Sequence, residues 1–322
     1  MSENKWDANK YRDQQFVIPK LKCDYPLVFN GHVESNKTQR RQWLQTLNLF
    51  PNQQVLDKYI SYEIEYLGSS WCPFFNQQDT LAVLKITDLV VLVDDMFVET
   101  GKYSQADIDN LFSGKTADQS IIAREFTALF EYFESRSNAR IVELFKRETK
   151  EHMSSALKYD NKFHESLTFD EYFDLRINDV AMKFVFLLCL VVGPHDFPLD
   201  LYDSPLFTRF HRVACVPFSL VNDLYSFGKE FDEPDYKNYV KVLTHQMGGP
   251  QHPTSIQLAL TKMQEIFDCS LVAYDAVCAE IMSQYSTHPT ICEYIKNNHI
   301  IMSTGIHFHQ TIARYNNYKK TN

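Results

Sequence analysis

Residues 222–230 read NDLYSFGKE and place an amide, a hydroxyl and a carboxylate at Asn222, Ser226 and Glu230. At 3.6 residues per turn, these three side chains fall within about 80° of one helix face and spread over about 12 Å. All three carry oxygen donors, which suit a hard divalent cation such as Mg²⁺ better than they suit zinc or copper. The stretch therefore predicts a helix that carries a metal site on one face.

A second acidic patch closes residues 81–95, an apolar segment that reads LAVLKITDLVVLVDD. Asp94 and Asp95 end this segment, and Glu99 lies one helical turn beyond Asp95. Carboxylates at the C-terminus of a helix oppose the helix dipole, so they need cations nearby. Two oxygen-rich patches on apolar helices indicate a buried site for several metal ions, with a substrate that carries phosphate on an apolar body.

The composition limits the class of protein. The chain has 322 residues, of which 44% are hydrophobic, and this is enough to bury a large core. A net charge of −9 provides no basic field, which argues against a nucleic-acid partner. The N-terminus lacks the apolar core of a signal peptide, and the longest uncharged apolar run, residues 184–193, is far shorter than the about 20 residues that span a bilayer. We therefore expect a cytoplasmic protein without a membrane span.

The periodicity of the apolar residues favours an all-α fold. Only 9 glycines occur, without a Gly-x-Gly-x-x-Gly or P-loop pattern, which argues against a nucleotide-binding α/β fold. Helical spacing recurs in seven segments, which are residues 81–95, 121–134, 140–158, 169–192, 205–230, 253–280 and 287–318. No linker separates them, so we expect a single domain over residues 1–322. The first 20 or so residues are expected to form a flexible arm.

The two acidic motifs, in this order and on helical segments, resemble the aspartate-rich motif and the NSE triad of microbial class I terpene synthases. Arg176 precedes the second motif by the spacing of the family's diphosphate-sensing arginine, and Asp179 and Val180 follow at its linker and effector positions. Near the C-terminus, Arg314 and Tyr315 resemble the family's Arg-Tyr pair. The resemblance covers most of the chain, and it points to the sesquiterpene synthases in particular.

The resemblance implies a helical bundle around a deep apolar cavity, with about three Mg²⁺ ions at its mouth. The implied metal ligands are Asp94, Asp95, Glu99, Asn222, Ser226 and Glu230. The implied diphosphate ligands are Arg176, Lys229, Arg314 and Tyr315. Two positions depart from the family pattern, because Glu99 lies one residue later than the third acid of the strict motif and Val180 replaces a frequent glycine.

Candidates for the apolar wall come from helical phase. Thr87, Val90 and Val91 lie one to two turns before Asp94, and Phe218 and Ser219 lie one turn before Asn222. Phe308 falls where the family often has an aromatic residue.

The implied activity is Mg²⁺-dependent ionisation of a prenyl diphosphate, with C15 farnesyl diphosphate favoured over C10 and C20 chains. The carbocation would yield a cyclic or linear terpene, and diphosphate would be released. One alternative is a trans-prenyltransferase that elongates isoprenoid diphosphates, although such an enzyme has a second aspartate-rich motif where this chain has NDLYSFGKE. Another is a helical homologue without catalysis, against which the complete motifs argue. The identity and stereochemistry of the product and the final proton loss or water capture stay open, and a homodimer is a family-level expectation.

Overall fold

The computed structural model describes residues 5–98, 100–113, 120–192 and 196–316, and these residues form helices and no strands. The prediction of an all-α fold is therefore confirmed. In chain order the α-helices are α1 (Val33–Thr46), α2 (Gln53–Ile60), α3 (Ile64–Ser70), α4 (Gln77–Val93), α5 (Gln105–Leu111), α6 (Ile121–Glu134), α7 (Ala139–Tyr159), α8 (Phe169–Asp179), α9 (Met182–Val191), α10 (Leu199–Tyr202), α11 (Pro205–Glu230), α12 (Tyr239–Gln246), α13 (Ser255–Gln284), α14 (Pro289–Thr311) and α15 (Ala313–Asn316). Within these described ranges, no helix combines the length and apolar character that crossing a membrane requires.

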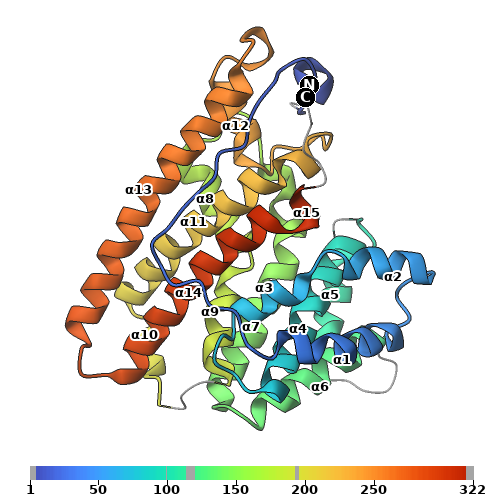
Figure 1. Ribbon diagram of the computed structural model, residues 1–322, viewed down its shortest axis with the longest axis vertical. Helices are drawn as coiled ribbons and strands as arrows, with labels where there is room; N and C mark the ends of the chain where they lie inside the picture. Colours follow the sequence, from blue (N-terminus) through green and yellow to red (C-terminus); the bar gives the residue numbers. More distant parts are fainter. Residues whose placement is uncertain (1–4, 99, 114–119, 193–195, 317–322) are drawn as a thin grey trace.

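The helices form two groups on either side of α7, α8 and α9 (Figure 1). One group contains the long helices α11, α13 and α14, in which α13 covers the outer side of α11 and α12. The other group contains α1 to α6, and within it α4 packs on α1, α3 and α6. Contacts between α3 and α14 join the two groups directly. The helices between the groups join them as well, because α8 contacts α11 and α7 contacts α4 and α6. The fold therefore brings α4 and α11, which carry the two acidic motifs, to the same central region.

Helix α11 begins and ends where the sequence predicts. Its first turn is capped by Ser204, whose side chain accepts a hydrogen bond from the backbone N–H of Phe207. Pro205 fits the first helical position, because that backbone N–H would have no partner inside the helix. Pro217 lies inside the helix, five residues before Asn222.

The prediction of one continuous helix over residues 169–192 is wrong. The structure divides this segment into α8 and α9, which meet at Val180 and Ala181. Ala181 has a φ of 65°, in the left-handed region, which an alanine adopts only at a steric cost. Since neither proline nor glycine marks the break, periodicity alone could not reveal it. A smaller break at Ile312 likewise separates α14 from α15 within the predicted segment 287–318.

The N-terminal residues 5–20, which we predicted to form a flexible arm, lie along α11 and α13 (Figure 1). The Trp6 indole is buried, stacks on Tyr11 and donates a hydrogen bond of 2.7 Å to the carbonyl oxygen of Phe231. Gln14 bonds to Ser255 at the start of α13. These contacts hold the segment against the end of α11 that carries Glu230.

A buried ionic cluster joins α1 to α4. The Arg40 guanidinium donates two hydrogen bonds to Asp88, of 2.7 and 2.6 Å, and one of 2.6 Å to Glu65. The Tyr59 hydroxyl donates to Asp88 as well, at 2.9 Å. Arg40, Glu65 and Asp88 are at most 4% exposed, so each charge depends on the others for compensation. Because Asp88 lies on α4, about two turns before Asp95, this cluster fixes the helix that leads into the first acidic motif.

We predict that Arg40→Met lowers the free energy of unfolding by about 3–5 kcal/mol, because two buried carboxylates would lose their cation. Arg41→Met is the matched control, since Arg41 pairs with Asp57 at the surface, where the side chains are 46% and 50% exposed. Exposed pairs contribute only about 0–1 kcal/mol. Urea unfolding at neutral pH measures both variants, and similar small losses in the two would contradict the importance of the buried cluster.

Candidate active site

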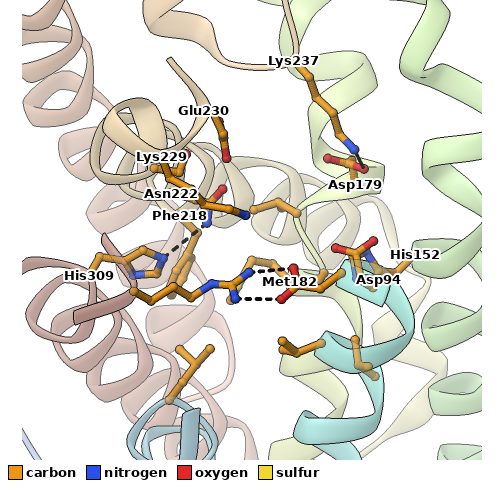
Figure 2. A pocket seen from close by; sticks show the side chains of 18 of the residues that line it. Asp94, His152, Asp179, Met182, Phe218, Asn222, Lys229, Glu230, Lys237 and His309 are labelled. Atoms are coloured by element: carbon orange, nitrogen blue, oxygen red, sulfur yellow. Dashed lines mark hydrogen bonds and ion pairs between the residues drawn. The ribbon is translucent and has the colours of Figure 1, made fainter. Parts of the chain in front are cut away.

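A cavity of about 530 Å³ lies between α4 and α11 (Figure 2). This volume is within the range of about 300–1,000 Å³ that small-molecule sites occupy. The lining changes from apolar to polar along the chain, from Val90 on α4 to Asp94 just after it and from Phe218 to Asn222 on α11. Val90 and Phe218 are buried, whereas Asp94 and Asn222 are partly exposed, so the polar end of the cavity faces solvent. The site can therefore receive a charged group at its mouth and an apolar body below.

Carboxylates lie on the α4 side of the mouth, which is the polar end of the cavity. Asp94 and Asp95 begin a π-helical turn, Asp94–Val98, that follows α4. Arg314 donates two hydrogen bonds of 2.7 Å to Asp95, and this pair lowers the pKa of Asp95 although burial opposes the shift. Burial raises the pKa of Asp94 to about 6, and the neighbouring Asp179 and Asp95 add to the shift while Lys237 and Arg314 oppose it. Such an arrangement favours an added cation at the mouth.

Asn222, Ser226 and Glu230 line the same cavity from α11. Their amide, hydroxyl and carboxylate oxygens fit a hard cation, and Glu230 is the only acid among them. No group of three or more His, Cys, Asp or Glu side chains in the described ranges could hold a metal ion by itself. This combination fits Mg²⁺, which proteins usually bind through one or two carboxylates together with phosphate groups of the substrate.

Asp223 and Arg176 hold the α8 side of the site against α11. Asp223 is fully buried and accepts hydrogen bonds from the Tyr172 hydroxyl at 2.6 Å and from Arg176 Nε at 3.0 Å. The same guanidinium pairs with Asp179 and donates a bond of 2.7 Å to the Asn222 side-chain oxygen. Arg176 therefore has a fixed position at the cavity, and it connects the Asn222 amide to the buried Asp223 carboxylate.

His309 lines the cavity from α14 and was not among the residues that the sequence predicts for the site. Its Nδ1 lies 2.7 Å from the Gly305 carbonyl oxygen, so Nδ1 carries the proton and donates it to that oxygen. The other ring nitrogen, Nε2, then accepts the hydrogen bond from the Asn222 amide nitrogen at 3.4 Å (Figure 2). The ring stacks on Tyr315 at a centroid distance of 4.7 Å. His309 and Arg176 thus contact the two ends of the Asn222 amide, with its oxygen toward Arg176.

Most side chains that the sequence predicts for the site line the cavity together. They are Thr87, Val90, Val91, Asp94, Asp95, Arg176, Asp179, Val180, Phe218, Asn222, Ser226, Lys229, Glu230, Arg314 and Tyr315. Glu99 lies outside the described residues.

Two predicted wall residues, Phe308 and Ser219, do not line the cavity. On α14 the cavity is lined by Gly305 and His309, which lie one turn apart, whereas the Phe308 ring is buried and packs edge-on against Tyr315. Ser219 is fully buried and its hydroxyl donates a hydrogen bond of 2.9 Å to the Cys215 carbonyl oxygen. We correct the prediction for both residues.

The sequence did not indicate several lining residues. Lys237 follows an acidic loop, and its ammonium lies 3.1 Å from Asp179, opposite Asp94 (Figure 2). Trp71 and Phe184 form an edge-to-face pair at 5.6 Å in the apolar wall. Phe184 belongs to the apolar run of residues 184–193, which has the pattern of an ordinary buried core. Helix α9, which carries Phe184 to the cavity, begins only after the break at Ala181. No local sequence signal distinguishes these side chains from their neighbours.

Comparisons with known proteins show similarity in sequence and in fold. A family model described as terpene synthase family 2, C-terminal metal binding, matches residues 85–271. Terpene synthase 7 of Dictyostelium purpureum is 26% identical over 288 residues, which cover 87% of this chain and 84% of that protein. Terpene synthase 11 of the same organism is 23% identical over 321 residues, covering 99% and 96%. Among solved structures, hedycaryol synthase in complex with HEPES is similar in fold, with a TM-score of 0.77, 19% identity, and coverage of 92% of this chain and 99% of that chain.

We predict that the His309 ring stays neutral down to about pH 5, because burial lowers its pKa to about 4 from an ordinary value of about 6.5. Nitrogen-15 NMR of the ring should show a protonated Nδ1 and an unprotonated Nε2 at neutral pH. A titration midpoint near the ordinary value, or the opposite tautomer, would contradict the hydrogen bonds that join Gly305, His309 and Asn222.

Proposed function

The chain belongs to terpene synthase family 2 and is a terpene synthase, a lyase that acts on phosphates, and we propose that it converts farnesyl diphosphate with the help of Mg²⁺. The observation that carries this proposal is the division of one cavity into a polar mouth and an apolar body. A prenyl diphosphate has the same division, with a charged head and a hydrocarbon tail.

We assign the metal-binding role to two sets of side chains at the mouth. Asp94 on the α4 side and Asn222, Ser226 and Glu230 on α11 would hold Mg²⁺ ions, about three in number, with Asp95 and Glu99 in support. When bound, Mg²⁺ supplies positive charge that stabilises the departing diphosphate. The neutral donors in the set leave room for diphosphate oxygens to complete the coordination.

Basic side chains around the same mouth would hold the diphosphate. These are Arg176, Lys229 and Arg314, and the neutral hydroxyl of Tyr315 would join them as a hydrogen-bond donor. Arg176 is fixed by Asp223 and Asp179, so its charge is in position before the substrate arrives. The bond between the allylic carbon and oxygen then breaks, and its electron pair leaves with the diphosphate. Asp179 and Val180, at the junction of α8 and α9, would form the link between diphosphate binding and ionisation.

The apolar wall would control the carbocation that remains. The rings of Trp71, Phe184 and Phe218 line the cavity, and aromatic faces stabilise positive charge. They also exclude water from the wall, which protects a reactive cation. Thr87, Val90 and Val91 add the α4 side, so the enclosed shape would determine how the chain folds and which carbons meet.

We further propose, from the sequence, that residues 1–322 form one domain and that the protein acts in the cytoplasm. The resemblance to the family adds the proposal of a homodimer.

We predict that Asn222→Ala reduces diphosphate release from farnesyl diphosphate by at least about 100-fold, because the reaction loses a group that positions charge against the leaving group. Asn110→Ala, on the exposed surface of α5, is the control and should retain wild-type activity. Circular dichroism should show that both variants stay helical. Full activity of a folded Asn222→Ala variant would contradict the metal assignment.

We also predict that Phe218→Leu changes the distribution of terpene products, whereas Phe308→Leu leaves it unchanged. Phe218 lines the cavity and Phe308 does not, although both rings are at most 7% exposed. Gas chromatography of the products from equal amounts of folded protein measures the difference. A new profile from Phe308→Leu and a wild-type profile from Phe218→Leu would contradict the placement of the wall.

A further inference from the structure

Asn238 lies just after the acidic loop that links α11 to α12, and its side chain contacts two of the three proposed metal ligands on α11. It is fully buried. The amide nitrogen donates hydrogen bonds of 2.9 Å to Glu230 Oε2 and 3.3 Å to Ser226 Oγ. A third bond of 2.7 Å goes to the backbone carbonyl oxygen of Asp223, the residue next to Asn222. One side chain therefore touches α11 at all three turns that carry the triad.

The orientation of this amide follows from its partners. Its oxygen accepts a hydrogen bond of 3.0 Å from the backbone N–H of Val240, which caps the N-terminus of α12. A flipped amide would turn its oxygen toward the acceptors Asp223 O and Glu230 Oε2, and it would turn its NH₂ group toward the Val240 N–H. Only the observed orientation satisfies every group. The two hydrogens of the Asn238 amide nitrogen are donated to the Asp223 carbonyl oxygen and to Glu230 Oε2. Ser226 Oγ shares one of these two hydrogens.

These contacts restrict the ligands rather than the substrate. Glu230 is the last residue of α11 and is partly exposed, so its side chain would otherwise be free to change rotamer. The bond to Asn238 holds one carboxylate oxygen and limits rotation of the group. Asn238 itself does not line the cavity, so it can act on bound ligands only through Ser226 and Glu230. Groups that orient metal ligands in this way commonly contribute about 10–100-fold to metal affinity.

We propose that Asn238 is a positioning residue that presents Ser226 and Glu230 to the metal ion. This inference rests on the proposed function, because it requires the triad on α11 to bind Mg²⁺. The competing explanation is that Asn238 serves α12 alone, as its N-terminal cap.

Two substitutions separate these roles. Asn238→Asp keeps an oxygen that can cap α12 and replaces the NH₂ donor by an oxygen that faces the Glu230 carboxylate and the Asp223 carbonyl. Asn238→Ser also keeps a capping oxygen but adds no charge. Aspartate and serine cap helices about as well as asparagine does. The matched controls are Asn52→Asp and Asn52→Ser, because Asn52 caps α2 through a bond of 3.0 Å to the Val55 N–H at the exposed surface.

The experiment measures thermal stabilisation of each full-length protein as Mg²⁺ is added in the presence of inorganic diphosphate. Wild type and both Asn52 variants should be stabilised at the same Mg²⁺ concentration. Both Asn238 variants should need about 10–100-fold more Mg²⁺ for half of the effect. Their diphosphate release from farnesyl diphosphate should recover toward the wild-type rate when Mg²⁺ is raised, because the ligands are still present but poorly held.

Several outcomes would overturn the proposal. If either Asn238 variant is stabilised at the wild-type Mg²⁺ concentration, the amide does not position the ligands, and the proposed metal site stands without it. The same conclusion follows if the Asn238 variants lose only metal-free stability. If Mg²⁺ and diphosphate do not stabilise the wild type either, the metal site itself fails, and the role of Asn238 fails with it.

Discussion

The ion pair between Arg176 and Asp223 is the contact on which the rest of the site depends. It joins α8 to α11 near the middle of the bundle, where Asp223 is 0% exposed. A buried ion pair repays the cost of losing water only when its remaining polar atoms are also bonded. Here the Tyr172 hydroxyl and the Tyr239 backbone N–H complete the shell of Asp223. The pair therefore fixes both the guanidinium at the mouth and the face of α11 that carries the triad.

The mouth of the cavity brings carboxylates close to one another and places basic side chains beside them, which offset their repulsion. Asp94 and Asp179 lie close enough for Asp179 to raise the pKa of Asp94, and Lys237 offsets part of this repulsion. Asp95 is held by Arg314, which α15 brings across from the other side of the cavity. Carboxylates and basic groups in such proximity are typical of sites that hold cations and polyanions together. The buried cluster around Arg40 also stabilises this arrangement, because Asp88 lies on α4, which leads directly into the turn that carries Asp94 and Asp95.

The sequence predicted those helices whose own residues form a recognisable pattern of apolar and polar positions. The helical spacing over residues 205–230 and the positions of Asn222, Ser226 and Glu230 were sufficient to locate α11 and its polar face. The division between α8 and α9 was missed because Ala181 adopts a left-handed backbone without a glycine. Phe308 was placed in the wall by resemblance to the family, whereas the phase of α14 turns Gly305 and His309 to the cavity instead. Asn238 and Lys237 follow a loop, and only the tertiary fold brings such residues to a site.

We propose that this cavity ionises a prenyl diphosphate with the help of Mg²⁺. The most direct measurement incubates the purified protein and Mg²⁺ with C10, C15 and C20 prenyl diphosphates separately and analyses the extracts by gas chromatography–mass spectrometry. We expect a terpene hydrocarbon or alcohol from the C15 substrate that disappears when EDTA removes the metal. Folded protein that yields no product from any of the three substrates, or the same product with EDTA present, would contradict the account.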